Sequence, residues 1–251
     1  MITLKSKKEI ECMKYSGMVA YSLLEELKDF IKVGISTNEI DKYVENYIKS
    51  KDCYPTCLGY EGFPKSACTS INDEVVHGIP SNRKLKEGDI ITVDIGVTYK
   101  NMIVDTAYTY IVGSVDKKIL ELVENTKKAL YEGLNVIKSG ITLNEVCKTI
   151  EKNANKHGYG VIKELTGHGV GYDFHEDPYI PNYSNKDSES IILKSGMTLA
   201  IEPMFSLNKE EVWMLENGWT ISTIDKSPTA HFEHTILVTD NGYEILTGKR
   251  E

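Results

Sequence analysis

The sequence has no long apolar segment. No run of the chain approaches the ~18 apolar residues that cross a bilayer. The opening residues, MITLKSKKEIECMK, are charged and lack the apolar stretch of a signal peptide. These absences exclude a membrane-spanning protein, and we expect a cytoplasmic protein that has no membrane partner.

Cysteine is scarce, and basic residues are outnumbered. The five cysteines, Cys12, Cys53, Cys57, Cys68 and Cys147, are odd in number and irregularly spaced, which argues against a disulfide framework and favours a reducing compartment. Cys53 and Cys57 lie four residues apart, but no second pair completes a zinc site. The net charge of −8 argues against nucleic acid as the main partner.

Apolar spacing and capping residues predict four helices. The pairs Ser36/Glu39 and Thr142/Glu145 stand at the spacing of a capping box, in which each of two residues satisfies the other's backbone N–H. The Gly-, Pro- and Tyr-rich stretch 53–80 is expected to be loop. After the fourth helix, strands are expected in GHGVGYDFHEDP, GMTLAIEPMF, WTISTID and HFEHTILVTDNGYEIL. The helices are expected over about 7–30, over STNEIDKYVENYIKSK, over 116–138 and over TLNEVCKTIEKNANKH.

A repeat organises these elements. IKVGISTNEIDKYVE at 31–45 and IKSGITLNEVCKTIE at 137–151 are identical at eight of fifteen positions. Two unrelated helices with good caps would explain the Ser/Thr and Glu matches, but not the shared IK-x-GI that precedes the cap. We expect one domain over 1–251, built from helix–helix–strand halves at about 1–112 and 113–251. A pseudo-twofold would relate them, and a site would lie where they meet.

Two aspartates interrupt a hairpin that otherwise resembles core, at Ile91–Val112. A turn at Lys100–Asn101 would place Asp94 opposite Ala107 and diagonal to Asp105, on one face of the hairpin. A slip of one residue would put the acids on opposite faces. Because like charges on a buried face repel and lose hydration, a bound cation is the expected compensation.

Other polar residues also stand in strand-like or glycine-rich segments. Taken singly, each would be an ordinary salt-bridged acid or a hydrogen-bonded histidine. Together, four carboxylates and one imidazole suit manganese, iron, cobalt or zinc. Two divalent cations would neutralise four carboxylates, and a two-metal site typically activates water for hydrolysis. These further residues are Glu202, Glu233, His168, His175 and His77.

Several motifs resemble those of the type I methionine aminopeptidases, from about residue 4 to the end of the chain. They are LGYEGFPKSACTSINDEVVHGIP, GDIITVDIG, GHGVGYDFHEDP, GMTLAIEP and EHTILVTDNGYEILT. The resemblance implies an α+β pita-bread fold, with two pseudo-twofold-related halves around a curved, mainly antiparallel central sheet. It also implies two divalent metals (cobalt, manganese, iron or zinc) on Asp94, Asp105, His168, Glu202 and Glu233, of which Asp105 and Glu233 bridge both ions.

The same resemblance implies the remaining site residues. His77, His175 and Glu202 would be catalytic, with the two histidines also contacting substrate. The implied methionine pocket consists of Cys57, Tyr60, Phe63, Cys68, Phe174 and Trp219. Aromatic edges and soft sulfurs suit a flexible thioether.

The implied activity is removal of the initiator methionine from nascent proteins and peptides whose second residue is small. We expect a cytoplasmic monomer, with the ribosome as a partner. One alternative is an X-Pro aminopeptidase, although those usually carry a large extra N-terminal domain and this chain begins at the catalytic portion. Another is a non-catalytic peptide-binding protein, which typically lacks some metal ligands. Glu61 stands where the family commonly has histidine, so a change in the preferred second residue, in the pH optimum or in metal affinity is expected.

Overall fold

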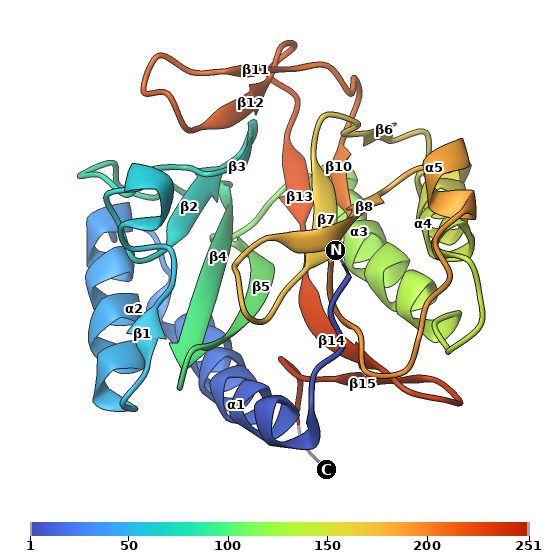
Figure 1. Cartoon of the computed structure of the whole chain (residues 1–251). Helices are drawn as coiled ribbons and strands as arrows, with labels where there is room; N and C mark the ends of the chain where they lie inside the picture. Colours follow the sequence, from blue (N-terminus) through green and yellow to red (C-terminus); the bar gives the residue numbers. More distant parts are fainter. Residues whose placement is uncertain (1, 250–251) are drawn as a thin grey trace.

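The computed structural model describes residues 2–249 and forms two flanking layers of helices with strands between them (Figure 1). The predicted capping box of the second helix is confirmed, because Ser36 and Glu39 each accept from the other's backbone N–H. The first helix has the same device at Ser6 and Glu9. The helices are α1 (Lys7–Phe30), α2 (Thr37–Ser50), η1 (Tyr60–Gly62), α3 (Lys117–Asn135), α4 (Leu143–His157) and α5 (Lys186–Glu189).

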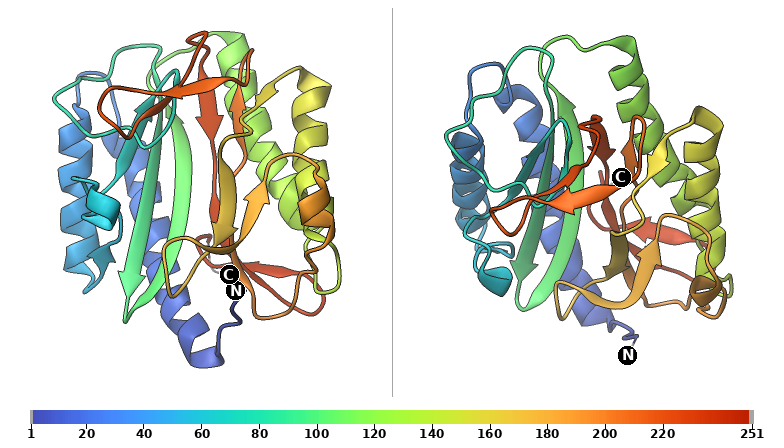
Figure 2. Two further views of the ribbon diagram at one scale, coloured as in Figure 1. Left: turned by 45° about the horizontal axis from the view of Figure 1, so that its top comes forward. Right: turned by 90° about the horizontal axis from the view of Figure 1, so that it is seen from above.

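In residues 2–249 the strands form four sheets, in the orders β1-β4-β2 with β5 beside β4, β13-β10-β6, β11-β12-β3 and β15-β14-β9-β7-β8. Adjacent strands run antiparallel, as expected (Figure 2). The strands are β1 (Tyr54–Pro55), β2 (Cys68–Ile71), β3 (Glu74–Val76), β4 (Ile90–Tyr99), β5 (Met102–Ile111), β6 (Gly160–Val161), β7 (Thr166–Gly169), β8 (Glu176–Pro181), β9 (Thr198–Ile201), β10 (Met204–Ser206), β11 (Val212–Met214), β12 (Ile221–Thr223), β13 (Thr229–His231), β14 (His234–Val238) and β15 (Tyr243–Ile245).

Two large hydrophobic cores divide nearly along the predicted halves. The first joins α1 and α2 to β4 and β5, through residues such as Leu23, Ile40 and Val93. The second joins α3 and α4 to β9 and β14, through residues such as Leu130 and Ile236. Each helix pair therefore buries its apolar face against the strands of its own half. Among residues 2–249, no helix is long and apolar enough to cross a membrane.

Several local expectations were wrong. The stretch 53–80 contains β1, β2 and β3, whose pairing partners lie later in the chain on β4 and β12. The third helix ends at Asn135 rather than 138. Thr142 precedes α4, but its side chain makes no capping bond. Short α5, β6 and β11 were not foreseen. Two or three residues are too few to show a period, and the four residues of α5 are polar.

Candidate metal centre and adjoining apolar pocket

The hairpin of β4 and β5 places its two acids as the sequence predicted. Asp94 pairs with Ala107, and the connecting turn holds Lys100 and Asn101 at positive φ. Asp105 pairs with Gly96, where an added Cβ would lie 2.6 Å from the Phe174 ring. Glycine at position 96 therefore lets an aromatic side chain approach the strand beside the acids.

The second half contributes its polar residues from strand ends and from breaks between strands. His168 lies on β7, Glu202 lies in the break between β9 and β10, and Glu233 lies in the break between β13 and β14. Main-chain bonds join Glu233 to the hairpin, because its N–H donates to Ala107 (3.0 Å) and its carbonyl accepts from Thr106 Oγ1 (2.8 Å). Residues from both halves thus meet at one place.

Three of the predicted ligands have atoms within 4.8 Å of one another, namely Asp105, His168 and Glu233. Asp94 and Glu202 line the same cavity of about 210 Å³. His168 Nε2 lies 3.4 Å from Glu202 Oε1 and 3.6 Å from Asp105 Oδ2. All five predicted ligands therefore face one small, polar cavity.

The electrostatics of this cluster are unfavourable without a cation. Burial, reinforced by the charge of Asp105, raises the pKa of Asp94 to about 8. Burial also raises the pKa of Glu202 to about 8. Burial together with neighbouring carboxylates holds the pKa of Asp105 and of Glu233 well above the usual range. Four carboxyl groups in this state are typical of a metal site, where cations replace the protons.

The donor atoms left free fit a hard or borderline divalent cation. Asp94 Oδ1 and Glu233 Oε1 are buried and have no hydrogen-bond partner. His168 Nδ1 lies 2.9 Å from the Gly169 carbonyl oxygen, to which it donates, so Nε2 is the ring nitrogen that faces the carboxylates and could bind a cation. Carboxylate oxygens with one imidazole nitrogen suit manganese, iron, cobalt or zinc.

An apolar pocket of about 90 Å³ adjoins the polar cavity and shares His77, Asp94, Asp105 and His175 with it. The six residues predicted for a methionine pocket gather here. Phe63 packs edge-on against Trp219 at 5.1 Å between ring centroids. The cluster consists of Cys57, Phe63, Cys68 and Phe174 with Tyr60, Ile79, Ile103 and Trp219 around them.

The two predicted non-ligand histidines lie at the junction of these cavities. His77 has a φ of +57° at the end of β3, and burial lowers its pKa to about 4. His175 lies in the loop before β8, and burial with the neighbouring imidazoles of His168 and His77 lowers its pKa. Tyr60 Oη lies 2.7 Å from His175 Nδ1. If the hydroxyl donates, His175 is the Nε2–H tautomer, and that single N–H is left to donate to a ligand.

The loop that carries His175 is tied to the start of the chain. Lys5 Nζ forms an ion pair with Glu176 Oε2 at 2.6 Å, and both side chains are almost fully buried. Glu176 Oε1 also accepts from the backbone N–H of Tyr172 (2.5 Å) and Asp173 (3.1 Å). These bonds fix the loop beside both cavities.

Sequence reasoning missed three residues of this region. Ile79 and Ile103 complete the apolar wall. Both stand in apolar stretches of the sequence, which predict core packing and do not indicate a pocket. His231, on β13, is buried beside Glu202. It stands in the same segment as Glu233, AHFEHT, where the residue pattern predicts only a strand.

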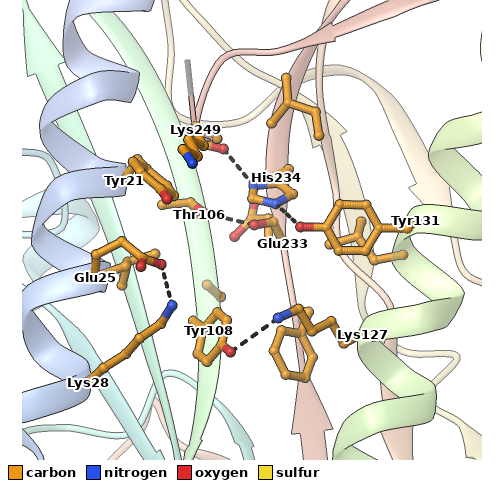
Figure 3. A pocket seen from close by; sticks show the side chains of 17 residues that line it. Tyr21, Glu25, Lys28, Thr106, Tyr108, Lys127, Tyr131, Glu233, His234 and Lys249 are labelled. Atoms are coloured by element: carbon orange, nitrogen blue, oxygen red, sulfur yellow. Dashed lines mark hydrogen bonds and ion pairs between the residues drawn. The ribbon is translucent and has the colours of Figure 1, made fainter. Parts of the chain in front are cut away.

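A separate cavity of about 350 Å³ lies between α1 and α3, lined by residues of β5 and β14 (Figure 3). His234 lies at its wall, with Nε2 3.1 Å from Tyr131 Oη and Nδ1 3.0 Å from Thr247 Oγ1. These contacts connect α3 and the C-terminal segment to the residue next to Glu233.

A buried carboxylate and imidazole cluster beside an apolar pocket, on two helix-flanked halves, defines a metal-dependent peptidase. The profile of metallopeptidase family M24 matches residues 11–240. Methionine aminopeptidase 1 of Bacillus subtilis (strain 168) is 44% identical, over 98% of this chain and 99% of its own length. The chain therefore belongs to the methionine aminopeptidases of metallopeptidase family M24.

Solved structures agree with this assignment and with the pita-bread fold. The crystal structure of methionine aminopeptidase from Thermotoga maritima has a TM-score of 0.97 and 43% identity, covering 99% of this chain and 100% of that chain. The prolidase of Pyrococcus furiosus has a TM-score of 0.78 and 26% identity, and the match covers 99% of this chain but 66% of the prolidase. The predicted family is confirmed, and the X-Pro alternative is not favoured.

Proposed function

We propose that this protein removes N-terminal methionine from peptides and nascent proteins whose second residue is small. The observation that carries the proposal is the junction of two cavities. An apolar pocket sized for one side chain opens beside a metal-binding cluster, and His77, Asp94, Asp105 and His175 line both. A methionine side chain in the pocket would bring its own peptide bond to the cluster.

Two divalent cations fit the charge of the cluster. Asp94, Asp105, Glu202 and Glu233 would carry four negative charges when ionised, and one divalent cation would leave two of them uncompensated in a buried site. The five expected ligands are these four carboxylates and His168, with manganese, iron, cobalt or zinc as the ion. When bound, such cations polarise the scissile carbonyl and lower the pKa of water.

The chain's own residues would bind, orient and move protons. Glu202, at the edge of the cluster, would accept a proton and pass it to the departing amine. His175 would donate its Nε2–H to the substrate carbonyl oxygen as negative charge develops there. Tyr60 would hold that tautomer through its bond to Nδ1, and His77 would contact the substrate backbone.

Specificity would come from the shape and softness of the apolar pocket. The Phe174 ring stacks on His175, with 5.1 Å between ring centroids, and meets Tyr60 edge-on at 5.0 Å. These contacts hold the side chains of the pocket wall in place. Cys57 and Cys68 add sulfur atoms that suit a thioether. Trp219 and Phe63 close the opposite wall.

Glu61 gives this chain a preference of its own. The residue is exposed, lies at the apolar pocket and has a φ of +48°. Its negative charge should disfavour acidic residues that follow the methionine, by a few-fold because exposed charges are screened. We expect Glu61→Gln to raise kcat/KM for Met-Ala-Asp relative to Met-Ala-Lys. An unchanged ratio would remove Glu61 from substrate selection.

We also propose that the enzyme acts as a cytoplasmic monomer on nascent chains at the ribosome. The irregular, unpaired cysteines support a reducing compartment. Light scattering with the purified protein checks the oligomeric state, and co-sedimentation with translating ribosomes checks the partner. A stable dimer or the absence of co-sedimentation would contradict the corresponding part.

A peptide assay tests the activity directly. Purified protein should release methionine from Met-Ala-Ser, lose that activity in EDTA and regain it when Mn²⁺ or Co²⁺ is added in excess. An X-Pro peptide, assayed in parallel, should remain intact. Intact Met-Ala-Ser in the presence of fully metal-loaded protein would overturn the proposal, and so would preferential cleavage of the X-Pro peptide.

A further inference from the structure

His231 is a buried imidazole close to the carboxylate cluster. The residue is 1% exposed, and neither ring nitrogen has a hydrogen-bond partner within the usual geometric limits. Its main chain is fixed on β13, because the N–H donates to Thr109 Oγ1 (3.0 Å) and the carbonyl accepts from the same hydroxyl (2.7 Å). A buried, unpartnered imidazole is costly, so its side chain is expected to have a role.

The His231 ring lies beside the carboxylate of Glu202. His231 Nε2 lies 3.3 Å from Glu202 Oε2, whereas His168 Nε2 lies 3.4 Å from Oε1 of the same carboxylate. The arrangement depends on the pairing of β13 with β10, which sets His231 opposite Met204, two residues beyond Glu202. Glu202 is thus held between two imidazoles, one for each oxygen.

We propose that His231 is a positioning residue that donates its Nε2–H to Glu202 Oε2. Oε1, which lies 3.4 Å from His168 Nε2, would then be the oxygen available to a bound cation. The two rings have complementary tautomers, because His168 donates from Nδ1 to Gly169 and keeps Nε2 free. The inference rests on the proposed role of Glu202 as a metal ligand.

An orienting bond of this kind has a general physical purpose. Carboxylates that bind metal are commonly held by a further hydrogen bond, which fixes their orientation, and loss of that bond typically weakens metal binding about 10–100-fold. His231 Nε2 lies beside Glu202 Oε2, whereas His168, one of the expected ligands, lies beside Oε1 of the same carboxylate. We therefore place His231 behind Glu202 rather than among the ligands.

Measurements of metal affinity test whether His231 acts as a hydrogen-bond donor or only fills space. We expect His231→Leu to bind Mn²⁺ about 10–100-fold more weakly than the unaltered protein in calorimetric titrations of metal-stripped samples. His231→Gln, whose amide can donate to the same oxygen, should recover most of that loss. Equal Mn²⁺ affinity in the Leu variant and the unaltered protein would overturn the proposal, as would equal losses in the Leu and Gln variants.

A measurement on the unaltered protein avoids any folding defect of the variants. Long-range ¹H–¹⁵N spectra of the zinc-loaded protein should show His231 as the Nε2–H tautomer, and His231→Gln identifies its signals. An Nδ1–H tautomer, or a zinc-bound Nε2, would overturn the proposal. The variant Glu202→Gln tests the ligand role of Glu202 separately from the positioning role of His231. If that variant binds Mn²⁺ normally, the ligand assignment fails. If Glu202→Gln weakens Mn²⁺ binding and His231→Leu does not, the ligand assignment stands and the inference about His231 fails.

Discussion

The two halves of the chain share one local structure, in the turn that precedes the second helix of each half. Gly34 and Gly140 have φ values of +90° and +95° before the second helix of each half. Gly34 N–H donates to the Leu85 carbonyl, and Gly140 N–H donates to the Leu193 carbonyl. The return bonds also match, from Leu85 N–H to Ile35 and from Leu193 N–H to Ile141. The duplication stays a prediction, which these matched bonds support.

The halves differ where they reach the cavity. The first half presents Asp94 and Asp105 from a regular ten-residue pair of strands. The second half presents Glu202 and Glu233 from positions at which its strands are interrupted. In the hairpin, the strand register alone places Asp94 and Asp105. In the second half, Glu202 and Glu233 reach the cavity from breaks between strands, where the alternation of side chains along a strand does not predict their direction. A repeated scaffold thus carries a site whose ligands are arranged differently on its two sides.

Removal of one acid from each half tests whether both sides serve one site. Asp105→Asn and Glu233→Gln should each reduce Met-Ala-Ser hydrolysis to the level of EDTA-treated protein, because each removes a charge and a ligand from the same cluster. Bound Mn²⁺ per chain, measured together with methionine release, checks the result. The exposed Asp240→Asn is the matched control and should behave as unaltered protein. Near-normal activity in either variant would assign the site to one half.

Substitution of His77 in the first half and of His175 in the second half should change different kinetic constants. His175→Ala should bind its metals normally yet lose about 10²–10³-fold in kcat, because a donor to the developing oxyanion is gone. His77→Ala, from the first half, should mainly raise KM, because that residue contacts the substrate backbone. The exposed His157→Ala serves as control. Identical changes in kcat and KM for His77→Ala and His175→Ala would contradict this division.

The pH dependence of the metal-free protein should reveal the carboxylates of both halves. Asp94 and Glu202 have a pKa of about 8 when folded, so the folded state holds more protons than the unfolded state and stability falls as pH rises towards 8. Burial lowers the pKa of His77, His175, His231 and His234, which act in the opposite direction, and this effect fades as pH rises through their unfolded pKa of about 6.5.

The carboxylate effect therefore dominates between about pH 7 and 8. Urea titrations of metal-free protein should show a falling free energy of unfolding across this window, and saturating Mn²⁺ should abolish the fall because cations replace the protons. A metal-free protein whose stability rises across the window would show that the acids are not held in this state.

The smallest expected difference lies in the helix caps. Ser36 closes a capping box on α2, and Thr142, at the matching position before α4, makes no side-chain capping bond. Ser36→Ala should lower the free energy of unfolding by about 1 kcal/mol, and Thr142→Ala by clearly less. Urea titrations of both variants provide the measurement. Equal costs would mean that the two helix starts are equivalent.

Local rules predicted the parts of the fold that depend on neighbouring residues. Helix starts followed from caps such as Ser36, and the register of β4 and β5 followed from a turn at Lys100–Asn101. The predicted acids and His168 then fell into one cavity. The resemblance to a family was needed for the pocket residues, because a buried Phe63 or Cys68 looks the same in any core.

Distant pairing decided what the sequence could not show. β2 and β3 are only four and three residues long, and their partners on β4 and β12 are not adjacent in the chain. His231 faces Glu202 only because β13 pairs with β10. A single histidine inside a strand carries no local sign of such a contact.

Anomalous diffraction from crystals of the Mn²⁺-loaded protein tests the central claim most directly. The account predicts manganese peaks in the polar cavity, bound by Asp94 and Asp105 from the first half and by His168, Glu202 and Glu233 from the second. Active, fully loaded protein whose manganese is bound by one half alone, or outside this cavity, would contradict it.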